Sequence, residues 1–224
     1  MAATAGPDSP SPRTTPTEGS VPEASGTRQR TQARLVLLRH GQTEWAASGR
    51  HTGSTDIPLT ALGEDQARSA GSRIAALGLH RPLVVSSPRS RAQRTAELAG
   101  LSVDREWDAL VEWDYGDYEG LTTPQIRETT PHWTVWTHPC PGGETIDAVS
   151  ARADLVLSVV VPTLADRDVV LVGHGHFSRA VIARWIEQPV TEGKRFAMAP
   201  AGFSVLGYEH EFRQVHTHNV DAGS

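Results

Sequence analysis

The chain has 224 residues, of which 38% are hydrophobic, and its 26 acidic and 21 basic side chains give a formal net charge of −5. This length suits one medium-sized domain with its own core, and the acidic balance disfavours nucleic acid as a partner. An anionic ligand must therefore be held by locally clustered arginines. The single cysteine, Cys140, excludes an internal disulfide and a multi-cysteine metal site, which fits a reducing compartment.

Residues 1–33 are rich in Pro, Ser, Thr, Gly and Ala and have no apolar period. Such a segment cannot bury enough surface to offset the entropy of ordering, so we expect a disordered tail at 1–33 and one domain at 34–224. The tail lacks the apolar centre of a secretory signal, and no later run is long enough to span a bilayer. These features predict a soluble cytoplasmic protein.

A short apolar run at 35–38 leads directly into Arg39, His40 and Gly41. This pattern predicts a buried strand that delivers polar side chains to its carboxyl end, where open α/β sheets bind ligands. Arg39 offers a planar fork of donors for phosphate or carboxylate. His40 is a candidate base, metal ligand or nucleophile, the alternative being a strand end with two solvated residues. Gly41 permits a tight turn or a close approach to a ligand.

The next segment, 49–56, is dense in turn formers and predicts a loop, in which Arg50, His51 and Thr52 are expected to be solvated. A helix with Thr60 as its N-cap follows, with a stop at Gly78.

A second buried strand is predicted at 82–87, and Pro88 leads from it into a helix that carries Arg89, Arg91 and Arg94. Three arginines at these spacings cannot share one face. Arg91 lies in the first turn, where free backbone N–H groups favour an anion, so we assign function to Arg91. A solvated basic helix explains Arg94 and, in part, Arg89.

After a third strand expected near Val103, residues 110–120 are acidic, aromatic and punctuated by glycine, which indicates an ordered loop. Glu112 follows an apolar pair beside large aromatic residues, as at a strand end. It is a candidate general acid with a raised pKa, although most such glutamates are simply exposed.

Residues 121–143 contain a helix start at Thr122–Pro124 and two tryptophans, Trp133 and Trp136. We interpret this insertion as a lid or wall over a pocket, the alternative being an auxiliary hydrophobic cluster. Cys140 has no basic neighbour in sequence to lower its pKa, so we assign it to packing.

An amphipathic helix is predicted from Ile146 to Pro162, followed by a buried strand at 169–173 that ends in His174, Gly175 and His176. Here a second strand runs into a helix with histidines at the turn, and the helix again supplies donors for an anion. Strands at 203–208 and 213–218 close the chain. We expect His210, His216 and His218 to be exposed there and give them no role.

The candidates therefore lie at four places, each after a strand: Arg39 with His40, Arg91, Glu112, and His174. Their chemistry suits phosphoryl transfer. A neutral imidazole is a competent nucleophile, while two arginines and a second histidine can hold the phosphoryl oxygens without a metal. One carboxylic acid can then protonate the leaving oxygen, and each well-placed donor is worth about 3 kcal/mol in the transition state.

Four blocks of sequence, in this order, resemble the phosphoglycerate-mutase-like branch of the histidine phosphatase superfamily. They are residues 38–45, residues 58–60 with Gly63 and 66–67, residues 87–88 with 91–92 and 95–96, and residues 173–175. The resemblance covers residues 34 to about 208. It implies a three-layer α/β/α fold with a mostly parallel central sheet between helices.

The same resemblance implies that His40 is phosphorylated, that Arg39, Arg91 and His174 bind the phosphoryl group, and that Glu112 is the proton donor. It implies no cofactor and no metal. It also implies substrate contacts from these positions: Gln42, Thr43, Thr52, Gly53 and Gly175. Two positions depart from the family pattern. Ala46 replaces a common asparagine, so one phosphate donor is missing or comes from Ser48. His176 replaces a common glycine and either contacts substrate, which we favour, or caps its helix.

The segment between Glu112 and His174 is rich in tryptophan and lacks the long basic insertion of cofactor-dependent mutases. We therefore predict a phosphatase for small phosphate monoesters, similar to actinobacterial broad-specificity acid phosphatases. A sugar bisphosphatase or a phosphoglycerate mutase is the alternative on the same fold. Two rival classes remain: an inactive module that binds phosphorylated ligands, and a less favoured metal hydrolase using His40, His174 and His176. The expected partner is a small phosphorylated metabolite; the natural substrate and the oligomeric state, including a homodimer, stay open.

Overall fold

The computed structural model describes residues 1–4, 6 and 33–221. Contacts divide the chain into two units, 1–30 and 31–224, and every strand and helix below belongs to the second. The predicted disordered tail at 1–33 falls almost wholly outside the described residues and stays a prediction.

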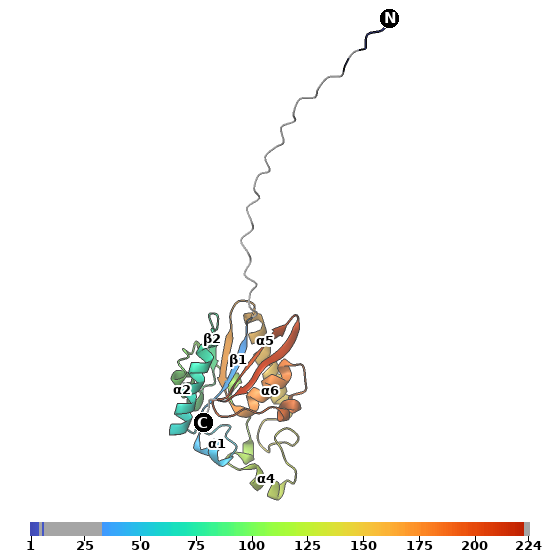
Figure 1. Ribbon diagram of the computed structural model, residues 1–224. Helices are drawn as coiled ribbons and strands as arrows, with labels where there is room; N and C mark the ends of the chain where they lie inside the picture. Colours follow the sequence, from blue (N-terminus) through green and yellow to red (C-terminus); the bar gives the residue numbers. More distant parts are fainter. Residues whose placement is uncertain (5, 7–32, 222–224) are drawn as a thin grey trace. The chain divides into compact units, whose positions relative to one another are not determined.

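The centre of the second unit is a mixed sheet (Figure 1). Its strands are β1 (Leu35–Arg39), β2 (Leu83–Ser86), β3 (Arg105–Glu106), β4 (Val169–Gly173), β5 (Phe203–Glu209) and β6 (Phe212–Val220). They lie in the order β3-β2-β4-β1-β5-β6. The first four in this order are parallel, and β5 and β6 are antiparallel to their neighbours. The predicted, mostly parallel sheet is confirmed.

Helices connect the strands and cover the sheet: α1 (Glu44–Ser48), α2 (Ala61–Ala75), α3 (Ser90–Leu98), α4 (Thr123–Thr129), α5 (Ile146–Thr163) and α6 (Gly175–Trp185). Short 3₁₀ helices span Asp108–Leu110, Gly116–Tyr118 and Val190–Arg195.

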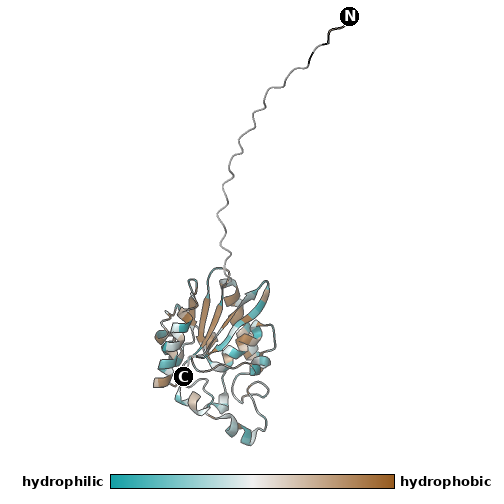
Figure 2. Cartoon of the chain, viewed as in Figure 1, coloured by the Kyte–Doolittle hydropathy of each residue, from teal (hydrophilic) through white to brown (hydrophobic). Residues whose placement is uncertain are grey.

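Alternate side chains of β1 point to opposite faces and enter two separate cores. Val36 and Leu38 pack in the core that contains Ala70 of α2. Leu35 and Leu37 pack in the other, which contains α5 and α6 residues. The strands accordingly form the brown, apolar centre of Figure 2, between helices with polar outer faces. The three-layer α/β/α architecture is confirmed.

Local signals for helix starts are confirmed by the cap geometry. The hydroxyls of Thr60 and Thr122 accept hydrogen bonds from the backbone N–H groups of Gly63 and Gln125, and Thr145, which was not predicted from the sequence, caps α5 in the same way through Ala148. Such caps satisfy donors that the first helical turn leaves free.

Gly41 serves a close approach, but to backbone rather than to a ligand. A Cβ atom on Gly41 would lie 2.2 Å from the carbonyl oxygen of Gly63, and one on Gly63 would lie 2.1 Å from the carbonyl oxygen of Gln42. The start of α2 therefore packs directly on the chain that leaves β1, and only glycine fits at either position.

Two boundaries differ from the sequence prediction. The third strand is β3 at Arg105–Glu106, where it pairs with Val85 and Ser86 of β2, and Val103 precedes it. Pro162 does not end its helix: α5 continues to Thr163. Pro162 occupies the last turn, where loss of one N–H donor is tolerated because only one backbone hydrogen bond depends on it. In the described residues, no helix combines the length and apolar character needed to cross a membrane.

Candidate active site

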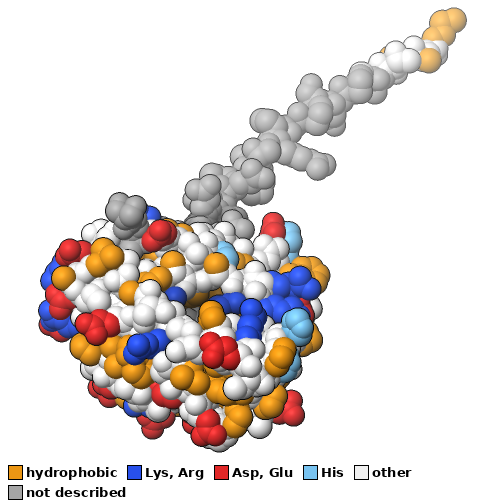
Figure 3. All heavy atoms as spheres, turned by 90° about the horizontal axis from the view of Figure 1, so that it is seen from below, with side chains coloured by type: hydrophobic (Ala, Val, Ile, Leu, Met, Phe, Trp, Pro, Cys, Tyr) orange, Lys and Arg blue, Asp and Glu red, His pale blue; other side chains and the backbone are white. Residues whose placement is uncertain are grey.

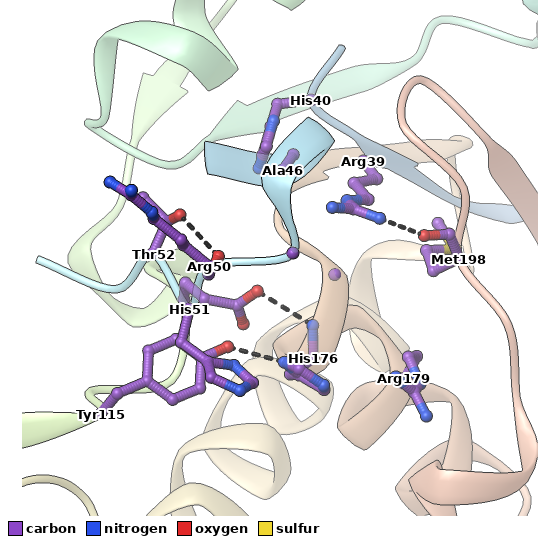
Figure 4. Close-up of a pocket in the computed structure, with 13 residues that line it drawn as sticks. Arg39, His40, Ala46, Arg50, His51, Thr52, Tyr115, His176, Arg179 and Met198 are labelled. Carbon is purple, nitrogen blue, oxygen red and sulfur yellow. Dashed lines mark hydrogen bonds between the residues drawn. The ribbon is translucent and has the colours of Figure 1, made fainter. Parts of the chain in front are cut away.

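A cavity of about 180 Å³ lies at the carboxyl end of β1 and β4. Its lining comes from the end of β1 and the segment 40–52, from the segment 112–115, from α6 and from Met198 (Figure 4): Arg39, His40, Ala46, Gly49, Arg50, His51, Thr52, Glu112, Tyr115, Gly175, His176, Arg179 and Met198. Figure 3 views the molecule from this end and shows basic and histidine side chains gathered on one side of it. The sheet edge thus holds the polar cavity that its strand ends predicted.

His40 is buried at the base of this cavity, with 4% of its surface exposed. Its Nδ1 lies 2.7 Å from the carbonyl oxygen of Gly41. A carbonyl can only accept, so Nδ1 carries the proton and Nε2 keeps a free lone pair. Burial lowers the pKa of His40 well below 6.5, and the charges of Arg39 and Arg91 lower it further. The imidazole is therefore neutral and nucleophilic at neutral pH.

His174 faces His40 across the cavity base, with 5.2 Å between ring centroids. It is the N-cap residue of α6 and is fully buried. Its Nε2 lies 2.8 Å from the Ser87 hydroxyl, whereas its Nδ1 is buried without a partner among the described residues. Burial also lowers the pKa of His174 well below 6.5, with further lowering by His40 and the arginines.

The two arginines beside these histidines are held by backbone carbonyls. Arg39 donates through Nη1 to the Met198 carbonyl at 2.5 Å. Arg91 is fully buried and donates to the carbonyls of Thr55, Thr52 and Gly53 at 2.8 to 3.2 Å. We call Arg39, His40, Arg91 and His174 the basic cluster.

Three buried nitrogens of the basic cluster have no partner in the described part of the chain: Nε of Arg39, Nε of Arg91 and Nδ1 of His174. Buried donors are rarely left unpaired, because each costs free energy unless something accepts its hydrogen. Burial also lowers the pKa of both arginines, which the negative charge of Glu112 opposes. A bound tetrahedral anion would satisfy these donors together.

Glu112 borders the basic cluster and is tied to the start of α6. Its Oε1 accepts from the N–H groups of Trp113 and Phe177 at 2.9 and 2.8 Å, and its Oε2 from that of His176 at 3.0 Å. The carboxylate is 7% exposed and lines the cavity. Glu112 was expected at a strand end but follows the 3₁₀ helix Asp108–Leu110. The N-terminus of α6 positions it, through the N–H groups of His176 and Phe177.

A set of rings, the aromatic wall, forms the other side of the site: His51, Tyr115, Trp133, Trp136 and His176. The Tyr115 hydroxyl lies 2.6 Å from Nδ1 of His176. His51 packs against Tyr115 and Trp133 with ring centroids 4.7 and 5.2 Å away, and Trp136 lies 5.4 Å from His176. The tryptophans stand behind the lining residues, so the 121–143 segment builds a wall rather than a lid.

The structure brings together most of the residues that the sequence proposed. Arg39, His40, Glu112, Thr52, Gly175 and His176 line the cavity, and Arg91 and His174 lie against its base. His176 does not cap its helix; that position belongs to His174.

Three predicted contact residues are instead used within the protein and do not line the cavity. Gln42 bonds with Thr60 and Gln66, and Thr43 caps α1. The N–H of Gly53 donates to Glu119, and its carbonyl accepts from Arg91. Ser48, offered as a substitute donor for Ala46, bonds to backbone carbonyls of α1. These four residues make contacts within the protein instead of lining the cavity, and substrate contacts from them stay a prediction.

Other cavity residues were not found from the sequence. His51 was expected to be solvated but is 9% exposed, and Arg50, Tyr115, Arg179 and Met198 also line the cavity. Only the density of aromatic residues around Tyr115 was a signal. His218 was expected to be exposed but is half-buried and bonds through Nδ1 to Ser204. Arg94 is surface-paired with Glu64 and Glu97, as the solvated alternative proposed.

This fold, with a buried histidine pair between two arginines at the carboxyl edge of the sheet, defines a histidine phosphatase. The model of the histidine phosphatase superfamily (branch 1) matches residues 35–221, and the chain belongs to that family.

The chain is similar in sequence to named phosphatases of other organisms. The chain is 53% identical over 182 residues to an acid phosphatase of Mycobacterium tuberculosis, which covers 81% of this chain and 90% of that one. It is 31% identical to the sedoheptulose 1,7-bisphosphatase of Saccharomyces cerevisiae, over 68% of this chain and 67% of that one. A solved structure from M. tuberculosis superposes with a TM-score of 0.84 at 50% identity, covering 85% of this chain and 99% of that chain.

Proposed function

We propose that this phosphatase of the histidine phosphatase superfamily hydrolyses small phosphate monoesters through a phosphohistidine on His40. One observation carries the proposal: a buried imidazole with a free Nε2 packs against His174 and is acted on by the charges of Arg39 and Arg91, and each of these three residues has a buried nitrogen without a partner in the described chain. The similarity to a mycobacterial acid phosphatase supports the same reaction class.

In the first step, Nε2 of His40 attacks phosphorus and the bond to the ester oxygen breaks. The phosphoryl oxygens take hydrogen bonds from Nε of Arg39, Nε of Arg91 and Nδ1 of His174 as charge spreads over them. Glu112, in its acid form, gives its proton to the departing alkoxide. An alcohol leaves, and the phosphoryl group stays on His40.

In the second step, water attacks the phosphohistidine and passes a proton to the Glu112 carboxylate. The P–N bond breaks, inorganic phosphate leaves and both groups return to their starting states. Nε2 of His174 lies 2.8 Å from the Ser87 hydroxyl, and in this scheme the hydroxyl is the donor, so that the proton of His174 is on Nδ1 and available to the phosphoryl group.

Two arginines neutralise phosphate in this scheme, so we propose that turnover needs no metal and resists chelators. Within the described residues, no group of three or more His, Cys, Asp or Glu side chains is placed to hold a metal ion. We further propose a cytoplasmic enzyme whose partner is a small phosphorylated metabolite. A bisphosphatase is the second candidate function, supported by the similarity to the yeast sedoheptulose 1,7-bisphosphatase.

The test is to trap the intermediate. The protein is mixed with p-nitrophenyl phosphate with and without EDTA, quenched in alkali and analysed by mass spectrometry. We expect the wild type to turn over in EDTA and to carry phosphate on His40. His40→Asn should show neither turnover nor bound phosphate. His216→Asn, at an exposed position of β6, is the matched control.

Turnover without phosphate on His40 would overturn the mechanism. Binding of phosphate esters without any turnover would indicate a phospho-ligand module instead. Loss of turnover in EDTA would indicate a metal hydrolase. A screen of phosphorylated metabolites, including 3-phosphoglycerate with and without 2,3-bisphosphoglycerate, would separate phosphatase, bisphosphatase and mutase activities.

A further inference from the structure

Arg179 is one of two cavity-lining arginines that the proposed reaction does not use, the other being Arg50. It lies on α6, on the same side of the cavity as Met198 (Figure 4). Its Nε donates to the Gly193 carbonyl at 3.0 Å, and its guanidinium stacks on Trp136, with Cζ 4.8 Å from the ring centroid. These two contacts fix the plane of the guanidinium. In the described part of the chain, neither of its Nη atoms has a hydrogen-bond or ion-pair partner.

No carboxylate among the described residues forms an ion pair with Arg179, although the negative charge of Glu112 opposes the lowering of its pKa by burial. Glu112 is the only acidic residue in the cavity lining of the described chain, and both of its oxygens accept backbone N–H groups. Neighbouring His176 cannot supply a second positive charge, because burial and Arg179 itself lower its pKa well below 6.5. Arg179 is therefore a positioned cation that lines the cavity and has no ion-pair partner among the described residues.

The position of Arg179 on α6 also sets how far a group bound there lies from the basic cluster. It follows His174 by five residues on the same helix, which is about 7.5 Å along the axis. Arginine side chains on helices lean back toward the N-terminus, which brings the guanidinium closer to the basic cluster. A group bound there can belong to the same small molecule as the phosphoryl group on His40.

We infer that Arg179 binds a second anionic group of the substrate, so that the preferred substrates are small phosphate monoesters carrying a carboxylate or another phosphate. A guanidinium presents paired donors in a fork that matches both groups. This inference rests on the proposed function: the basic cluster takes the phosphoryl group that is cleaved, and Arg179 takes the anion that is not.

The experiment compares kcat/KM for substrates with and without a second anion. Glycerol 3-phosphate is the reference without a second anionic group. 3-Phosphoglycerate carries a carboxylate as its second anion, and fructose 1,6-bisphosphate carries a second phosphate. We expect the wild type to prefer one or both anionic substrates, and Arg179→Gln to lower kcat/KM for them about 10- to 100-fold, mainly through KM, as for loss of a charged hydrogen bond. Glycerol 3-phosphate should change less than threefold. Whichever anionic substrate responds identifies the second group as carboxylate or phosphate.

Two variants separate charge from structure. Arg179→Lys keeps the cation and should retain part of the preference. Arg184→Gln is the matched control, because Arg184 lies on the same helix, pairs with Asp154 at 2.7 Å and does not line the cavity. Melting temperatures of all variants show whether the fold is kept.

Equal losses of kcat/KM with Arg179→Gln on substrates with and without a second anion would overturn the inference. Removal of the preference by Arg50→Gln rather than by Arg179→Gln would also overturn it. Absence of any preference in the wild type would also overturn it while hydrolysis of glycerol 3-phosphate upheld the proposed function. If no ester were hydrolysed, the proposed function itself would fail.

Discussion

The basic cluster and the aromatic wall face each other across one cavity but are built differently. Arg39 and Arg91 are gripped by backbone carbonyls, and His40 by its neighbour's carbonyl. The wall is held by ring packing and by side-chain hydrogen bonds, such as those between Tyr115 and His176 and between His51 and Thr123. The carbonyls that hold the basic cluster belong to Gly41, Met198 and the loop at 52–55, whereas the wall combines rings from the loop at 49–55, the segment 113–136 and α6.

This difference assigns separate tasks. A phosphoryl group has the same shape in every monoester, so its site benefits from donors held rigidly by backbone. The rest of the substrate varies, and loop side chains are where binding surfaces change most readily. We therefore expect substitutions in the basic cluster to affect all substrates, and substitutions around the wall to affect stability or substrate choice.

The largest effect is expected at Glu112, where the two regions meet. Glu112→Gln removes the proton for the leaving group, so kcat on alkyl phosphates should fall about 10²- to 10⁴-fold. p-Nitrophenyl phosphate has a good leaving group and should lose much less. Since the amide NH₂ cannot accept the backbone hydrogen bonds of the carboxylate oxygen that it replaces, the ratio between the two substrates is the measurement. Equal losses on both would show a structural role alone.

The next effect concerns the wall and acid stability. Burial lowers the pKa of His51 from 6.5 to about 4, against a smaller raising effect of Glu119. Between these values the unfolded state binds more protons, so the free energy of unfolding decreases as the pH falls from about 6.5 to 4, by about 3 kcal/mol for this group. The buried His40, His174 and His176 act in the same direction.

Urea unfolding at pH 7 and pH 4 measures this loss. His51→Asn should make the difference between the two pH values smaller by about 3 kcal/mol, even though loss of the bond to Thr123 destabilises it at both. His216→Asn should leave the difference unchanged. An undiminished pH dependence in His51→Asn would contradict the burial of a neutral imidazole in the wall.

The smallest effect links the two regions through Glu119. Its carboxylate accepts from the N–H groups of Gly53 and Thr55, whose carbonyls hold Arg91. Glu119→Gln turns one acceptor into a donor, so we expect a loss of about 1–2 kcal/mol in stability and about 10-fold weaker inhibition by inorganic phosphate. Glu128→Gln, at an exposed position of α4, is the control. Unchanged phosphate inhibition would mean that Arg91 keeps its place without this loop.

Much of the fold and of the basic cluster could be predicted because its signals are local. The apolar run before Arg39 and that before His174 each specify a buried strand, and parallel strands place their carboxyl ends at one edge. Thr60 and Thr122 cap their helices through bonds three residues away. Strand, cap and first turn each depend on a few neighbouring residues, which a single sequence displays.

The sequence by itself therefore determined an α/β/α domain in which His40, Arg39, Arg91 and His174 converge. Only the tertiary structure decided the rest: that His51 is buried, and that the Tyr115 hydroxyl contacts His176 61 residues away. It also decided that Gly53 donates its N–H to Glu119, and that Arg179 bonds to Gly193 through Nε while its Nη atoms have no ion-pair partner in the described chain. Each of these contacts joins loops or helix faces distant in the chain. Their geometry depends on how whole layers pack, and no periodicity or cap in the sequence encodes it.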